Sequence, residues 1–197
     1  MLSSIGIFLL GTIVGLLITL YVGQWFVALL PGPRVAASIN GIRGDTENTV
    51  GCLYYVIIIT IEQPVDYIYL KAQFPDNINN YKVGLPQESQ TPATGRVQLQ
   101  AWEAGRDQNG NCTIVQAAIN NSADVQTSTA GNMISIHASE LPPQTNIMGM
   151  VATTEGKSTI SPRPASVYTE GEYKYLKLGL TVRRRLRVSL EGIANAN

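Results

Sequence analysis

The sequence has few charged residues and almost no imbalance between their signs. Charged side chains make up 14% of its 197 residues, whereas an average soluble domain has about 25%. Lysine plus arginine and aspartate plus glutamate number 14 each, so no net charge attracts the chain to nucleic acid. We therefore expect no nucleic-acid partner, and any electrostatic function has to come from a local patch.

The sequence also lacks the residue sets of common catalytic sites. Its single histidine, His137, lies in the segment ISIHASE, where a packed or surface residue is more common than a general base. The chain offers no second histidine and no cysteine–histidine pairing for nucleophilic chemistry. No nucleophile-elbow, zinc-protease or phosphate-loop motif occurs. We predict a protein that is not an enzyme, with no catalytic residue, no cofactor and no metal.

Cysteine is scarce, and its meaning is open at this stage. Cys52 and Cys112 are the two cysteines of the chain. Either they form a disulfide, which requires an oxidising compartment, or they are two buried thiols. Two N-x-S/T matches, at Asn111 and Asn120, are short enough to arise by chance in a chain rich in asparagine.

Against this background, the beginning of the chain is distinctive. Residues 1–33 contain no acidic or basic side chain, and residues 5–30 are almost wholly apolar. A helix of that length reaches about 39 Å, enough to cross a bilayer core of about 30 Å. Tyr21 and Trp25 lie near its end, where amphipathic rings favour the headgroup zone. We predict a single-pass membrane protein with a transmembrane helix that stops at Pro-Gly-Pro, residues 31–33.

A cleaved signal peptide is the alternative, but the basic n-region is missing and the apolar core is too long. Orientation depends on two charges. Arg34 and Arg43 follow the helix, and no lysine or arginine precedes it. The positive-inside rule therefore weakly favours a cytoplasmic location for the rest of the chain.

Small residues recur every fourth position within this helix. Gly11, Gly15, Thr19 and Gly23 fall on one slowly turning ridge. In lipid, helices associate through close backbone approach, which small residues permit. We predict that this small-residue ridge packs against another transmembrane subunit; the alternative is a chance spacing in a glycine-rich span.

Residues 34–197 have the texture of an all-β domain. Short apolar runs alternate with turn signals, and no useful 3.6-residue period follows the helix. The predicted strands cover residues 35–42, 50–62, 65–74, 81–85, 95–104, 112–119, 133–138, 147–153 and 173–190. We expect an antiparallel β-sandwich, or a small barrel as second choice, with a long loop near residues 153–172.

Residues 50–62 are apolar at both odd and even positions, as expected for a central strand covered on both faces or one with an outer contact surface. Residues 65–74 follow after Gln63-Pro64, and we predict that the two segments form a hairpin.

A single N-terminal helix, a strand-rich domain over residues 35–190 and the segment ASELPPQT before a late strand together resemble membrane-anchored proteins with an immunoglobulin-like sandwich. The antibody signature is absent: Trp102 precedes Cys112 by ten residues, and Gly110 stands where the corner tyrosine would be. The resemblance implies a layout and no functional residues.

The final run, residues 173–190, alternates apolar and basic residues. If it is one strand, Lys177, Arg183, Arg185 and Arg187 form a basic stripe on its outer face. The stripe is either a solvated face or a surface for anionic lipid headgroups or an acidic partner. Arg184 breaks the apolar face, which suggests edge protection, a bend or a buried carboxylate partner.

The loops offer oxygen ligands in two places. The segment DQNGN, residues 107–111, has Asp and Asn oxygens suited to Ca²⁺, but Asn-Gly between strands is first of all a hairpin turn. Residues 44–48 receive the same interpretation.

Two functions remain in view. The first is a structural accessory subunit of a larger membrane complex, for example photosynthetic or respiratory, whose helix docks in the membrane and whose sandwich clamps the surface. The second is a membrane-tethered ligand-binding or sensor module. Its aromatic cluster would come from Tyr54, Tyr55, Tyr67, Tyr69 and Trp102.

Overall fold

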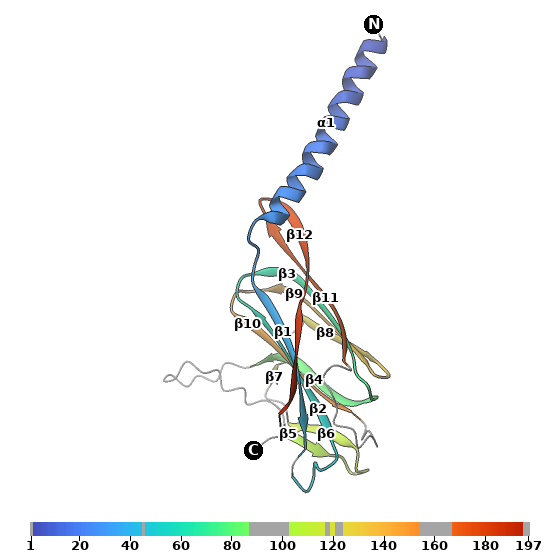
Figure 1. Cartoon of the computed structure of the whole chain (residues 1–197), viewed down its shortest axis with the longest axis vertical. Coiled ribbons are helices and arrows are strands. Elements are labelled where there is room, and N and C mark those ends of the chain that lie inside the picture. The colour runs from blue at the N-terminus through green and yellow to red at the C-terminus, as the bar shows by residue number, and fades with distance from the viewer. Residues whose placement is uncertain are drawn as a thin grey trace, which may run out of the picture.

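The computed structural model describes residues 2–44, 46–86, 103–116, 119–120, 124–153 and 167–194. One helix, α1 (Leu2–Leu29), projects from one end of an all-β domain (Figure 1). The chain turns into the domain at Pro31-Gly32-Pro33, where proline ends the helix. A single apolar N-terminal helix followed by an all-β domain is the predicted order of elements.

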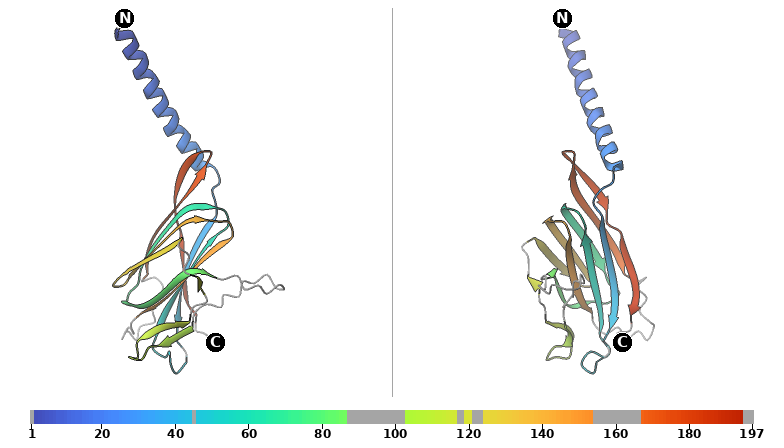
Figure 2. Two further views of the ribbon diagram at one scale, coloured as in Figure 1. Left: turned by 180° about the vertical axis from the view of Figure 1, so that it is seen from behind. Right: turned by 90° about the vertical axis from the view of Figure 1, so that its left-hand side faces the viewer.

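Two main sheets form the domain and face each other (Figure 2). In spatial order the six-stranded sheet comprises β13 (Val188–Ala194), β1 (Val35–Arg43), β2 (Leu53–Ile61), β10 (Thr145–Thr153), β4 (Ile78–Pro86) and β7 (Ile119–Asn120). The five-stranded sheet comprises β12 (Leu180–Arg185), β11 (Tyr168–Lys177), β3 (Val65–Gln73), β9 (Met133–Leu141) and β8 (Val125–Ala130). A separate hairpin pairs β5 (Glu103–Arg106) with β6 (Cys112–Gln116).

The core lies between the two main sheets. Ile57, Ile59 and Ile61 of β2 are buried there with Ile68 and Leu70 of β3. Each sheet has two distinct end strands, so the described strands form a sandwich rather than a closed barrel.

The prediction of an antiparallel sandwich is wrong at one pair, because β1 and β13 run parallel. Between Arg185 and Val188 the chain crosses from one sheet to the other without reversing, so β13 continues in the direction of β12 (Figure 1).

The predicted hairpin of residues 50–62 and 65–74 does not form. Strand β2 pairs with β1 and β10 in one sheet, whereas β3 pairs with β11 and β9 in the other. The corner at residues 62–64 carries the chain across the sandwich. Both strands are rich in buried residues, and each has a hydrogen-bonded neighbour on both sides within its own sheet.

Strand β2 is covered on both faces, which was one of the two interpretations of its sequence. Its outer face carries Tyr54, which packs in a second small core between the six-stranded sheet and the β5–β6 hairpin. The Tyr54 hydroxyl donates a hydrogen bond to the Gly105 carbonyl at 3.0 Å. A disulfide joins Cys52 and Cys112 within this second core, with 5.6 Å between the Cα atoms. It therefore fastens the hairpin to the outside of the sandwich, not one main sheet to the other.

Several smaller expectations have clear outcomes. Residues 107–111 form the β5–β6 turn, in which Asp107 Oδ1 accepts hydrogen bonds from the backbone N–H groups of Asn109 and Asn111. A hydrogen bond from the Asn111 side chain, together with these backbone bonds, lowers the pKa of Asp107. Residues 173–190 form three strands instead of one. The predicted strand at 95–104 and loop at 153–172 fall mostly outside the described residues.

Candidate functional site

The apolar surface of α1 is uncovered. It contains the stretch Leu9–Val27, 19 residues that are long and apolar enough to cross a membrane, judged by length and composition alone. The large apolar side chains described along it are exposed, among them Leu10, Ile13, Leu17 and Val22. The last turn touches the sandwich, where Val27 is 7% exposed and joins the main core.

The small-residue ridge lies on this uncovered helix. A side-chain carbon added at Gly11, Gly15 or Gly23 would meet nothing within 4 Å. The Thr19 hydroxyl turns back and donates a hydrogen bond to the Gly15 carbonyl at 2.8 Å. This bond satisfies the polar group within the helix, as an apolar environment requires, and it keeps the ridge free of a projecting hydroxyl.

The end of α1 is held by cations from the β11–β12 hairpin. No basic residue lies in the last turn of the helix itself. Instead, Arg184 Nη2 donates a hydrogen bond of 2.9 Å to the Leu30 carbonyl, and Lys177 Nζ donates one to the Pro31 carbonyl. Positive charge at this end complements the helix dipole, and the two bonds satisfy carbonyls just beyond the last helical residue.

This contact answers the question raised by Arg184 in the sequence. Arg184 lies on β12, an end strand of its sheet, as the edge explanation expects, and it also bonds a main-chain carbonyl 154 residues away, which none of the three explanations named. The break in alternation was a usable signal, but alternation cannot show which distant group the side chain meets.

Two tyrosines complete the junction between helix and sandwich. The Tyr173 hydroxyl donates a hydrogen bond to the Pro33 carbonyl at 3.3 Å in a buried position. Tyr175 packs so closely on Gly32 that an added Cβ would lie 2.3 Å from the tyrosine oxygen. Burial raises the pKa of Tyr173, while nearby Arg184 opposes the rise. Residues 30–33 are therefore bonded to and closely packed against the β11–β12 hairpin, and we call this junction the fitted joint.

The predicted membrane-interface residues lie just before this joint. Tyr21 and Trp25 are both exposed. The Trp25 and Phe26 rings meet edge to face with centroids 5.6 Å apart. Nothing among the described residues covers Tyr21.

The predicted basic stripe is not one row. Because the chain reverses after Lys177, its members fall on different faces. Arg183 and Arg185 pair with Lys174 and Glu172, which places them on the outer face of the five-stranded sheet. Lys177 points to the helix joint on the other face. Arg187 is exposed in the link between β12 and β13.

A shallow groove of ≈ 620 Å³ follows that outer face. One row of neighbours crosses all five strands: Gln126, His137, Tyr69, Glu172 and Arg185. The Tyr69 and His137 rings lie 4.8 Å apart between centroids.

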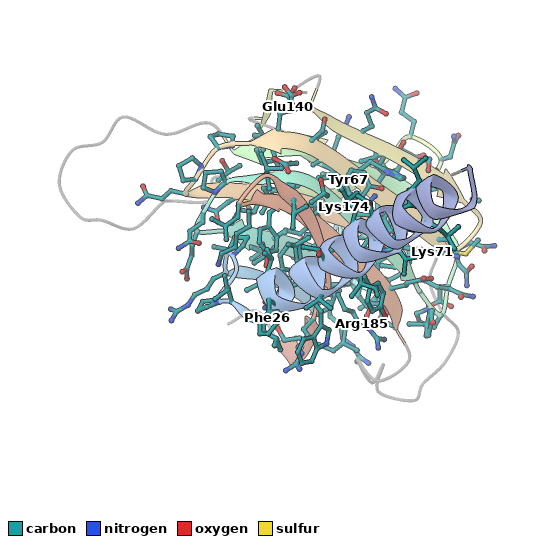
Figure 3. All side chains as sticks on the ribbon, turned by 90° about the horizontal axis from the view of Figure 1, so that it is seen from above. Phe26, Tyr67, Lys71, Glu140, Lys174 and Arg185 are labelled. Carbon is teal, nitrogen blue, oxygen red and sulfur yellow. A yellow bond between two sulfur atoms is a disulfide. The ribbon has the colours of Figure 1, made fainter. Side chains whose placement is uncertain are left out.

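Charged groups lie beside the neighbouring Tyr67 ring. Lys174 Nζ lies 4.7 Å from the Tyr67 ring centroid, and Figure 3 shows the two side by side. Glu172 contacts the guanidinium of Arg183 and lies 3.9 Å from Lys174 Nζ. The groove thus combines aromatic faces with hydrogen-bond donors and acceptors.

The predicted aromatic cluster is only partly assembled. Tyr67 and Tyr69 line the groove, whereas Tyr54 and Tyr55 are buried in the two cores. Trp102 lies outside the described residues. The Tyr67 hydroxyl and His137 Nδ1 lie 3.3 Å apart, so the lone histidine is a packed residue of the sheet face.

Comparisons with known proteins give only distant likenesses. No family model matches the chain, and no curated protein matches it. An exo-β-N-acetylglucosaminidase from Vibrio harveyi in complex with N-acetylglucosamine has a TM-score of 0.39 and 10% identity, over 85% of this chain and 19% of that one. A structure titled as manganese lipoxygenase of Gaeumannomyces graminis with partial zonadhesin of Komagataella pastoris gives 0.41 and 8%, over 77% and 45%.

This chain thus spans about a fifth of the glycosidase chain and under half of the other. At these TM-scores, neither likeness assigns a fold family or a function.

Proposed function

We propose that this chain is a non-enzymatic accessory subunit of a larger membrane complex, with α1 as its single membrane span. The observation that supports the proposal best is a helix whose apolar surface is uncovered while its last residues are built into the sandwich. In water, that much exposed apolar surface is unfavourable, at about 25 cal/mol per Å². A bilayer and a partner helix remove the surface from water.

The fitted joint favours a helix that remains part of the mature protein. A cleaved signal peptide leaves the mature domain, but here Val27 is part of the main core and the Leu30 and Pro31 carbonyls are hydrogen-bonded by the domain. Removing the segment would leave Arg184 and Lys177 without these acceptors.

The disulfide reverses our expectation about the side of the membrane. Arg34 and Arg43 weakly favoured the cytoplasm, but disulfides are rare in its reducing environment. With Cys52 bonded to Cys112, we propose that the sandwich lies on the outer, oxidising side. Two arginines are a weak signal, because the positive-inside rule depends on an excess of basic residues near the ends of the span.

In the proposed complex, the small-residue ridge docks on another transmembrane subunit and the sandwich clamps the complex at the surface. The open space beside Gly11, Gly15 and Gly23 supports this role, since close backbone approach drives helix pairing in lipid. A photosynthetic or respiratory complex is one such host. An immunoglobulin-like layout of the sandwich remains part of the proposal.

Purification in mild detergent tests the proposal. We expect the wild-type chain to elute with membrane partners and Gly15→Leu to lose them while still inserting. Gly6→Leu is the matched control, because nine residues along a 3.6-residue helix place position 6 on the opposite side. Elution of the wild-type chain as a lone monomer, with all membrane complexes intact after its deletion, would refute the role.

The groove on the five-stranded sheet favours one second candidate, a membrane-tethered ligand-binding or sensor module. Tyr67, Tyr69 and Tyr168 offer ring faces, and Glu172, Arg183 and Arg185 offer polar contacts for an envelope polymer or small molecule. Thermal shift of the full chain with neutral and anionic oligosaccharides tests this candidate, with Tyr69→Ala as the control. An unshifted unfolding temperature across the panel would count against it.

A further inference from the structure

The tip of the β11–β12 hairpin is an unusual turn. Two residues, Leu178 and Gly179, join the strands, and their φ angles are 49° and 74°. Two-residue turns with positive φ at both positions favour Asn-Gly or Asp-Gly. A leucine adopts this conformation only against a steric penalty. The chain nevertheless places Leu178 there, with 78% of its surface exposed.

The tip stands beside the end of α1. Lys177, the last residue before the turn, is bonded to the Pro31 carbonyl, and Arg184 of the returning strand is bonded to that of Leu30. In Figures 1 and 2 the hairpin reaches the level of the helix base. The two bonds hold the turn at a fixed height relative to the helix.

Exposed apolar side chains from the helix end and from the hairpin tip lie at the level of the helix base. We call them the apolar collar: Phe26, Leu29 and Leu30 from the helix end, and Leu176 and Leu178 from the hairpin. Figure 3 shows Phe26 at the base of the helix. Leu176 is 63% exposed although it lies in a strand next to buried Tyr175. The collar residues of the helix continue the apolar surface of the proposed membrane span, while Lys177 and Arg184 of the hairpin bond the carbonyls at its end.

We propose that the β11–β12 tip inserts into the interfacial layer of the lipid bilayer beside α1, with Leu176 and Leu178 entering the upper acyl region. The inference rests on the proposed membrane span. A bilayer is the occupant because Leu29 and Leu30 directly follow the span, and the bonds of Lys177 and Arg184 hold the hairpin beside the end of the helix that carries exposed Trp25. The insertion gives the sandwich a second attachment, which fixes its rotation about the helix axis as well as its height.

The experiment uses the full chain in nanodiscs of phosphatidylcholine and phosphatidylglycerol, with the environment-sensitive dye NBD on one introduced thiol. The native cysteines are bonded to each other, so labelling is specific. Leu178→Cys reports the tip, Leu17→Cys the middle of the helix, and Asn109→Cys the exposed turn of the β5–β6 hairpin. Lipids with a nitroxide near the top of the acyl chain provide a quencher.

We expect the dye at 178 to emit at shorter wavelength than at 109 and to be quenched by the shallow nitroxide, while the dye at 17 is shielded from water. Water-like emission at 178 with a shielded 17 would overturn the inference and leave the span intact. A water-exposed 17 would overturn the span itself. Shielding at 178 without nitroxide quenching would indicate protein contact, which also contradicts insertion.

A second variant separates the tip's role from its folding. Leu178→Asn creates the Asn-Gly pair that this turn favours, so it should unfold at the same temperature as wild type or higher. In that background, a dye at Leu176→Cys should be quenched less by the shallow nitroxide than in the wild-type background. Unchanged quenching would show that Leu178 does not drive insertion.

Discussion

Arg184 on β12 donates a hydrogen bond of 2.9 Å to the carbonyl oxygen of Leu30, across 154 residues of sequence. The bond joins the last strands of the sandwich to the end of the helix. Lys177 makes the equivalent contact with Pro31. Because of this pair of contacts, the helix and the domain are fastened by side chains as well as by the peptide chain.

Replacing Arg184 should loosen this joint. A hydrogen bond from a charged group is worth about 1.5–3 kcal/mol, and its loss in Arg184→Ala should expose the bond after Arg34 to trypsin. Arg183→Ala is the control, because Arg183 contacts Glu172 on the outer face instead. The rate at which limited trypsin releases the helix from the chain in detergent is the measurement. Equal rates in the two variants would contradict the role of Arg184.

Gly32 should not tolerate a side chain. A Cβ at this position would lie 2.3 Å from Tyr175 Oη and 2.7 Å from its Cζ, so Gly32→Ala should lower the unfolding temperature. Tyr175→Phe should recover part of the loss, because the tyrosine oxygen is buried with no hydrogen-bond partner among the described groups. Gly23→Ala, which meets nothing within 4 Å, is the control; a similar loss there would refute the steric explanation.

The disulfide should carry a measurable share of stability. Its cysteines are separated by 60 residues, and closing a loop of that size in the unfolded chain corresponds to about 4 kcal/mol. Cys52→Ser, or reduction of the wild type, should lower the free energy of unfolding by up to that amount, as measured by urea titration. In native membranes, neither cysteine should react with a maleimide until a reductant is added. Reaction without reductant would contradict the outer location.

Alkaline pH should destabilise the sandwich through Tyr55. Burial, with a smaller contribution from Asp76, raises the pKa of Tyr55 to about 12 from 10.0. The folded state therefore keeps the proton that the unfolded state releases above pH 10. The stabilisation is complete below pH 10 and is lost as pH rises toward 12, by up to about 3 kcal/mol. Tyr55→Phe should show a flatter fall of unfolding free energy over this range, and an equally steep fall would exclude Tyr55 as the cause.

The helix and most strands could be predicted from the sequence. Charge-free residues 1–33 and the β-branched runs depend on local composition, which a sequence reports directly. Strand β8 was missed because VQTSTA is polar and exposed at most positions. It is an edge strand that needs no apolar face.

Pairing was harder to predict than the strands themselves. Residues 62–64 look like a hairpin turn, but β2 and β3 lie in different sheets, and the local sequence does not distinguish a turn within one sheet from a corner between two. The break of residues 173–190 at Leu178-Gly179 was hidden because a leucine occupies a turn position that usually signals itself with asparagine. The basic stripe was predicted on the assumption that these residues form one strand. Because they belong to three strands, the basic residues do not share one face.

Contacts of the candidate site were the least predictable. The ridge was visible as a spacing, and the uncovered helix is consistent with it without testing it. The fitted joint forms because the fold brings residues 30–33 next to residues 175–184, which are far away in the sequence. No local sequence pattern predicts such a contact. The sequence left the disulfide and two buried thiols as alternatives, because the packing of the β5–β6 hairpin on β2, which brings Cys52 and Cys112 together, is not a local property.

Photo-crosslinking along α1 in native membranes tests the central claim most directly. A photoreactive residue is introduced in turn at Gly15 and Thr19 on the ridge, and at Leu17, about 200° around the helix from Gly15. We predict a discrete adduct with one membrane protein from positions 15 and 19, and lipid adducts alone from position 17. Lipid adducts alone from all three positions, or the same protein adduct from all three, would contradict docking through the ridge.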